Sequence, residues 1–184
     1  SRPPGLKGVS NPAAALGGSD PEPAEQARRS VPLGTRTLGR AVSVRDYEDY
    51  ALAFNGIAKA QAAVLELADG PTVVLTIAGP AGEMLGEGHQ VHQRLLAALK
   101  AYGDPLVRLQ LLPHAASGFR LALKVLPDPA LEAARVLAAV EAALRTHFGF
   151  DARALGQPVL HSEIAAVAHA VPGVVAIDVD ALYG

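Results

Sequence analysis

The histidines offer the first chemistry to test in this sequence. His89 and His92 stand three residues apart near a predicted helix start, and zinc sites use histidine pairs at this spacing. The sequence contains no cysteine, and Glu87 is the one nearby carboxylate that could join them as a ligand. Two solvated histidines at a helix end explain the pattern more simply, so we predict no metal site.

Ser162, with His161 or His169 and with Asp178, has the residue types of a nucleophilic hydrolase site. No Gly-x-Ser-x-Gly sequence surrounds the serine, and His169 lies too far along the same short predicted helix to activate it. A serine that caps the helix is the simpler interpretation. Asp178 and Asp180 share one face of a predicted strand and could form a paired-carboxylate acid–base site. Solvated charges near the end of the chain are the simpler interpretation. We therefore predict no catalytic residue and no enzyme.

The glycine-bearing segment 79–88 lies between a predicted strand and a predicted helix, a position that phosphate-binding loops occupy. It lacks both the Lys-Ser/Thr pair and the G-x-G-x-x-G spacing of such loops. Glu83 and Glu87 in this segment would also repel a phosphate. We interpret it as an ordinary mobile loop and predict no cofactor.

Composition excludes further classes of protein. Of 184 residues, 50% are hydrophobic and only 4% aromatic, so Ala, Val and Leu must build the core. The net charge of −2 argues against a dedicated nucleic-acid binder. No apolar run reaches the roughly 18 residues that span a bilayer. These features indicate an α+β protein that binds neither nucleic acid nor membrane.

Hydrophobic periodicity predicts regular structure after residue 40. Ser43 and Asp46 have the spacing of a capping box at the start of the first helix. Strands over 57–67 and 72–77 are expected to form one antiparallel hairpin, and strands over 106–112 and 119–125 a second. The remaining expected elements are helices over 43–55, 89–102, 130–148 and from 162, and a final strand over 175–179.

This order predicts an α+β fold with two small open sheets, each covered on one face by helices in a ferredoxin-like style. We expect one lobe over 41–104 and another over 105–184, preceded by an extended arm over 1–40. The arm is rich in Pro and Gly and carries six basic and three acidic residues. A floppy linker and an arm ordered against a partner both fit this composition.

The arm and the first helix carry the most specific pattern in the chain. They contain Asn-Pro and Gly-Gly within 9–22, then Arg40-Ala41-Val42-Ser43, Asp46-Tyr47-Glu48 and Gly56-Ile57-Ala58-Lys59-Ala60. In order and spacing these segments resemble the baseplate J-like family of contractile phage tails and related injection systems. Asn55 departs from the family pattern, which has Pro before the glycine. Gly156-Gln157-Pro158-Val159, Ser162-Glu163-Ile164 and Val171-Pro172-Gly173-Val174 resemble the closing region of the family.

The residues that match the family signature have structural rather than catalytic chemistry. Glycine pairs permit backbone paths that other residues resist, carboxylates suit the first turn of a helix, and a tyrosine can bury its ring while its hydroxyl stays bonded. Arg36 and Arg40 flank the signature; we expect them to make inter-chain contacts, the alternative being solvated arginines. The signature positions are Asn11, Pro12, Gly17, Gly18, Asp20, Glu22, Ala41, Ser43, Asp46, Tyr47, Glu48 and Gly56.

The resemblance implies a non-enzymatic wedge subunit that helps assemble a baseplate and relays its conformational change to sheath contraction. The implied partners are other wedge and hub proteins and further copies of the chain in a sixfold particle. The chain would be the C-terminal part of such a protein, assembled in the bacterial cytoplasm and resident in the virion or a tail-like particle. The lobes would move as rigid bodies on loops such as 103–105 or 113–118.

Two other functions compete with this interpretation. A free-standing small-molecule-binding or regulatory module would have an apolar pocket and would form a monomer or small oligomer. A hydrolase would depend on Ser162 or on a His/Asp site. The arm separates them from the first hypothesis, because an assembly subunit needs such a segment and the other two do not.

Overall fold

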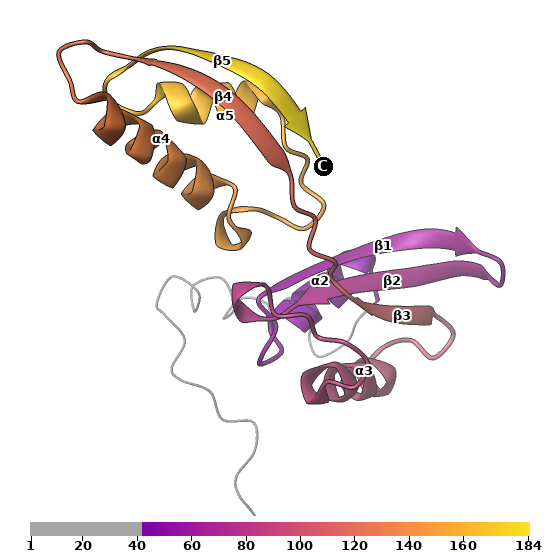
Figure 1. The fold of residues 1–184 in the computed structure, drawn as a ribbon. Helices are drawn as coiled ribbons and strands as arrows, with labels where there is room; N and C mark the ends of the chain where they lie inside the picture. The colour runs from indigo at the N-terminus through magenta and orange to yellow at the C-terminus, as the bar shows by residue number, and fades with distance from the viewer. Residues whose placement is uncertain (1–41) are drawn as a thin grey trace, which may run out of the picture.

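The computed structural model of the protein describes residues 42–184, which form two lobes (Figure 1). Each lobe is a small sheet with two α-helices packed on it. The first lobe contains α2 (Val44–Leu52), β1 (Lys59–Leu67), β2 (Gly70–Ala78), a 3-10 turn η1 (Pro80–Gly82), α3 (Gln90–Tyr102) and β3 (Arg108–Pro113). The second lobe contains β4 (Arg120–Pro127), α4 (Ala133–His147), a 3-10 turn η2 (Phe150–Ala152), α5 (His161–His169) and β5 (Val174–Tyr183).

The first sheet has the order β1-β2-β3. β1 and β2 pair antiparallel from Lys59↔Ala78 to Leu67↔Gly70, which confirms the first predicted hairpin. Gly70 has a φ of 104°, a left-handed conformation that glycine adopts without strain at this tight turn. β3 pairs parallel with β2 after the chain has crossed over through α3. β2 therefore has a hydrogen-bonded neighbour on each edge.

The second predicted hairpin, between 106–112 and 119–125, is wrong. β3 joins β2 in the first sheet, and β4 pairs antiparallel with β5 in a separate two-stranded sheet. Alternation along a strand predicts which residues face the core, but it does not choose the neighbouring strand. The predicted boundary at residue 104 consequently separates β3 from its own sheet. That the two lobes are separate domains stays a prediction.

The α+β class and the two small open sheets are confirmed. As in ferredoxin-like folds, helices cover one face of each sheet. The strand order differs from those folds, because the two sheets have three strands and two strands. The expected arm over 1–40 lies outside the described residues. Within residues 42–184, no helix combines the length and apolarity needed to cross a membrane.

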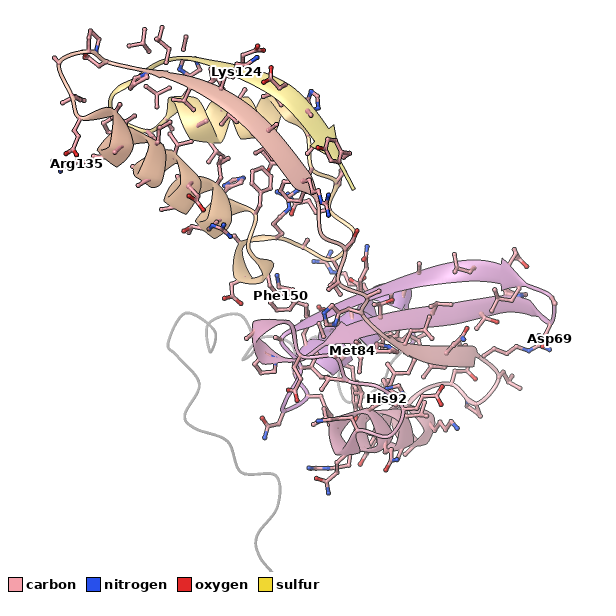
Figure 2. All side chains as sticks on the ribbon, viewed as in Figure 1. Asp69, Met84, His92, Lys124, Arg135 and Phe150 are labelled. Atoms are coloured by element: carbon pink, nitrogen blue, oxygen red, sulfur yellow. The ribbon has the colours of Figure 1, made fainter. Side chains whose placement is uncertain are left out.

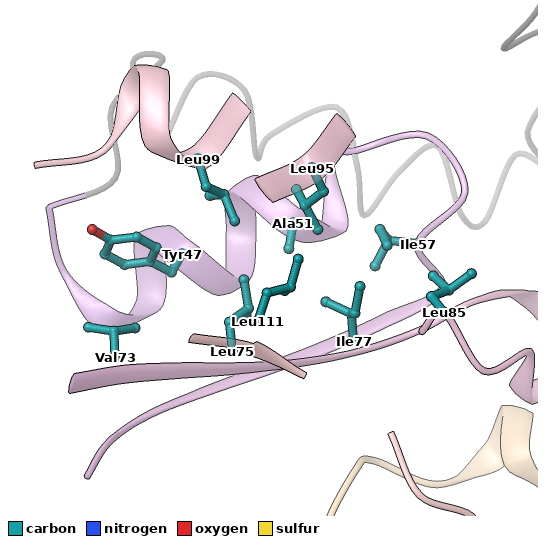
Figure 3. Packing of buried hydrophobic residues seen from close by; sticks show 10 residues of the cluster. All are labelled: Tyr47, Ala51, Ile57, Val73, Leu75, Ile77, Leu85, Leu95, Leu99 and Leu111. Carbon is teal, nitrogen blue, oxygen red and sulfur yellow. The ribbon is translucent and has the colours of Figure 1, made fainter. Parts of the chain in front are cut away.

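The core of the first lobe lies between β2 and its two helices. Leu75 and Ile77 of β2 point toward α2 and α3 and are fully buried (Figure 3). The helices contribute the apolar faces that their 3.6-residue periodicity predicts. The cluster comprises Tyr47, Ala51, Ile57, Val73, Leu75, Ile77, Leu85, Leu95, Leu99 and Leu111.

The second lobe has a smaller core. Val136 and Val140 of α4 and Ile164 and Ala168 of α5 are its buried apolar side chains. The predicted core stripe of α4 is therefore only partly buried, since Leu137 stays 46% exposed. The predicted pair of Glu141 and Arg145 on the wet side of α4 is confirmed at 2.8 Å.

Replacing Leu75 by Ala should lower the free energy of unfolding by about 2–5 kcal/mol, because it leaves a cavity between fully packed elements. Leu106→Ala is the matched control, since Leu106 is 90% exposed and the same truncation should change the free energy by less than about 0.5 kcal/mol. Urea unfolding followed by circular dichroism measures both. Equal effects of the two substitutions would contradict the burial of β2.

Candidate functional site

The signature segment begins with a complete capping box at the N-terminus of α2. The Asp46 amide donates to Ser43 Oγ at 3.2 Å, and the Ser43 amide donates to Asp46 Oδ2 at 2.7 Å. Backbone donation from Ser43 lowers the pKa of the Asp46 carboxyl below its ordinary value. The predicted cap is confirmed, and both side chains satisfy backbone groups of the helix end.

Tyr47 follows the cap and anchors α2 to the far end of α3. Its side chain is buried, and burial raises the pKa of its hydroxyl. The hydroxyl accepts a hydrogen bond from the backbone of Asp104. It lies so close to Gly103 that a Cβ there would stand 3.3 Å from the oxygen. The signature tyrosine thus joins the first helix to the turn that ends α3.

Glu48 and Gly56 fasten α2 to the sheet and to α3. The amide of Ala62, on the outer strand β1, donates to Glu48 Oε1 at 2.8 Å. Gly56 adopts a φ of 94°, and a Cβ there would lie 3.0 Å from Val91 Cγ2 on α3. Glycine at this position therefore serves both a left-handed turn and a close helix contact.

The described signature residues accordingly form one structural cluster around α2. Their polar atoms bind backbone groups of the same lobe. The other predicted positions lie outside the described residues, namely Asn11, Pro12, Gly17, Gly18, Asp20, Glu22, Arg36, Arg40 and Ala41.

The two histidines considered for a metal have separate structural contacts. His89 caps α3 by accepting from the Val91 amide at 3.2 Å. His92 lies 2.9 Å from the Leu85 carbonyl and is only 3% exposed, so its prediction as a solvated residue is wrong. Sequence periodicity does not identify the loop that folds over His92. No three His, Cys, Asp or Glu side chains within 42–184 gather as a possible metal site.

The residues considered for catalysis are not assembled into one site. His161 and His169 are the two ends of α5. Leu160 takes the N-cap position of α5, so the predicted cap at Ser162 is wrong; Ser162 lies within the first turn. Asp180 accepts from Lys124 Nζ at 2.7 Å, and Asp178 stands opposite Lys124 in the β4–β5 register. Both aspartates therefore lie beside the positive charge of Lys124 on the neighbouring strand β4.

The glycine-bearing segment folds back on itself instead of forming a cradle. The Gly79 amide donates to the Glu83 carbonyl at 2.9 Å, across the turn η1. Ala81 adopts a φ of 54° within this turn. The turn also places Gly82 beside Phe150 of the second lobe. A Cβ on Gly82 would lie 3.4 Å from the Phe150 ring. The segment helps to join the lobes.

The contact between the lobes centres on Lys59, which belongs to the segment 56–60 of the family resemblance but was not predicted to make a contact. Lys59 Nζ donates to the carbonyls of Phe150 and Arg153 and lies 4.1 Å from the centroid of the Phe150 ring. Burial lowers the pKa of Lys59. Phe150 lies between the lobes in Figure 2 and packs against His114, with 5.8 Å between ring centroids. In the sequence, the clue to this contact is a single lysine among the small apolar residues at the start of a strand.

Arg153 extends this junction into the second lobe. Its guanidinium is largely buried and donates to Glu163 Oε1 at 2.9 Å, while His147 Nε2 lies 2.8 Å from the same oxygen. Hydrogen bonds from Arg153 and then His147 lower the pKa of Glu163. This chain of contacts joins the loop after η2 to α4 and α5.

Comparison with known families gives one match. Residues 39–112 match the family model described as the baseplate J-like central domain. The matched range contains α2 and continues into β3, so it covers the first lobe and its signature cluster. A search of curated proteins found no match.

Replacing Glu48 by Leu should lower the free energy of unfolding by about 1–3 kcal/mol, because the Ala62 amide loses a charged acceptor. Glu48→Gln keeps an acceptor oxygen and should recover part of this loss. Urea unfolding of the three proteins measures the difference. A Glu48→Leu protein as stable as the original would contradict the link between α2 and β1.

Glu163 should make part of the stability depend on acid pH. A carboxyl whose pKa is lowered in the folded state stabilises the fold above its unfolded pKa, near 4.5, and this contribution is lost as the pH falls through the folded value. The melting temperature should therefore fall less between about pH 5 and about pH 3 in Glu163→Gln than in the original. Glu141→Gln, in an exposed pair on α4, is the control. Identical pH profiles for all three would refute this role of Glu163.

Proposed function

We propose, from the baseplate J-like central domain that this chain carries over residues 39–112, that the protein is a wedge subunit of a contractile tail or injection system. The domain supports a structural role in a phage baseplate. The finer proposal is that the subunit assembles the baseplate and relays its conformational change to sheath contraction. The family match to the signature-bearing lobe is the observation that carries this function.

The chemistry of the signature supports a mechanical role. Ser43, Asp46, Tyr47 and Glu48 bind backbone groups of the same lobe, and none of them lines a pocket. Side chains used in this way hold elements at fixed positions, which is the chemistry that a scaffold requires. The proposed subunit is therefore a scaffold and not an enzyme.

The junction between the lobes supports the proposed relay. One short segment, 114–119, connects β3 to β4, and the Lys59 contacts with Phe150 and Arg153 join the lobes beside it. A junction made of Lys59 and the contacts of Phe150 can open without unfolding either core. We place the proposed hinge at 113–118, and not at 103–105, because the latter turn lies within the first lobe against Tyr47.

Partners and location follow from the same proposal. The subunit would bind other wedge and hub proteins and further copies of itself in a sixfold particle. Arg36 and Arg40 would contribute inter-chain contacts from the arm. The subunit would assemble in the bacterial cytoplasm and remain in the virion or tail-like particle, without nucleic-acid, membrane or cofactor binding.

The proposal predicts that the chain sediments with particles. Lysates of producing cells are pelleted at high speed, and the fractions are blotted for this chain and viewed by negative stain. We expect the chain in fractions that contain tail-shaped particles. Its confinement to the light soluble fraction, in cells that do make particles, would overturn the proposal. Loss of sedimentation on deleting 1–40, with the circular dichroism of a folded protein retained, would support the arm as an assembly segment.

A further inference from the structure

An apolar groove runs along the second lobe between β4 and α4. It has a volume of about 690 Å³. Leu121, Leu123 and Val125 line one wall, and α4 supplies the other with residues that include Leu137 and Leu144. Figure 1 shows α4 alongside β4 on the helix-covered side of the sheet. The groove therefore opens beside a strand that has β5 as its one hydrogen-bonded neighbour within residues 42–184.

The two lobes differ by one strand. In the first lobe, two helices cover three strands and enclose a core of ten buried hydrophobic residues. In the second, two helices cover two strands, and Leu137 on α4 remains 46% exposed. A strand added to the free edge of β4 would cover this apolar wall and pair the unbonded backbone groups of the edge.

Among residues 42–184, the outer half of β1 offers a free strand edge with exposed leucines that fit the groove. Near the start of β1, Glu48 already occupies the Ala62 amide, so α2 shields that part of the edge. Beyond it, Leu65 is 47% and Leu67 43% exposed, on a hairpin whose tip at Asp69 projects away from the second lobe (Figure 2). Side chains alternate along a strand, so these two leucines share one face and Glu66 lies on the other.

Glu66 on the outer half of β1 and Arg120 on β4 carry opposite charges. Arg120 and Lys124 alternate with the groove-lining residues of β4, so they lie on the opposite face of that sheet. On this face Lys124 is already paired with Asp180, which leaves Arg120 for Glu66 when Leu65 and Leu67 enter the groove. Neither Arg120 nor Glu66 has an ion-pair partner among residues 42–184, and opposite charges on neighbouring strands stabilise their pairing.

We infer that the outer half of β1 from a second copy of this chain adds to the free edge of β4 and places Leu65 and Leu67 in the groove. The two edges are different surfaces, so the contact is head-to-tail and each copy keeps one edge for the next. This contact rests on the proposed function as an assembly subunit and names one surface through which copies associate.

Engineered cysteines test the contact without interference, because the chain has no native cysteine. A Leu65→Cys chain is mixed with a Leu137→Cys chain and treated with a short bismaleimide, so each product must join two copies. Leu106→Cys, on a residue 90% exposed and outside the groove, replaces Leu137→Cys in the control. We expect the heterodimer in the first mixture and little of it in the control.

Charge exchange gives an independent readout. Glu66→Arg in the Leu65→Cys chain should reduce the cross-linked product about two- to fivefold, and Arg120→Glu in the Leu137→Cys chain should restore it. Circular dichroism confirms that every variant is folded. Restoration by the double exchange is expected only when the two residues face each other.

Other occupants of the groove give other results. Equal products in the test and control mixtures would overturn the inference, as would self-linking of Leu137→Cys chains, which would indicate a contact between two α4 helices. Stronger linking of Leu137→Cys to a Leu33→Cys chain would assign the groove to the arm. If cross-linking fails while the chain still sediments with particles, this inference falls alone; cross-linking of a chain absent from particles would overturn the proposed function.

Discussion

The burial of β2 is the constraint on which the described structure depends. This strand has β1 on one edge and β3 on the other, so its backbone groups are paired on both sides. Its apolar side chains meet α2 and α3, and Leu75 and Ile77 have no exposed surface. A strand without a free edge accepts no further strand, so it is the fixed element of the lobe.

The signature residues hold the elements that cover this strand. Ser43 and Asp46 begin α2, Tyr47 joins it to the end of α3, and Glu48 joins it to β1. Each contact ends on a backbone group, so a change at any of them displaces an element and not only a side chain. A cluster held in this way would move as one rigid body, which the proposed relay requires.

The second lobe lacks an equivalent central strand. Its sheet has two strands with an irregular register, its buried apolar set is small, and its groove remains open beside β4. Its contact with the first lobe depends on Lys59 and a few groups around Phe150. The first lobe therefore has the larger core, while the second presents an open apolar groove suited to a neighbour.

The sequence by itself determined the local features of this protein. The capping box at Ser43, the β1–β2 hairpin and the apolar faces of α2 and α3 depend on residues close in the chain, and local patterns predict such features. The family match spans residues 39–112, which include the signature positions from Ala41 to Gly56. Only the tertiary structure decided that β3 joins β2, that His92 is buried and that Lys59 joins the lobes. These contacts link segments far apart in sequence, and alternation along a segment carries no information about its neighbour.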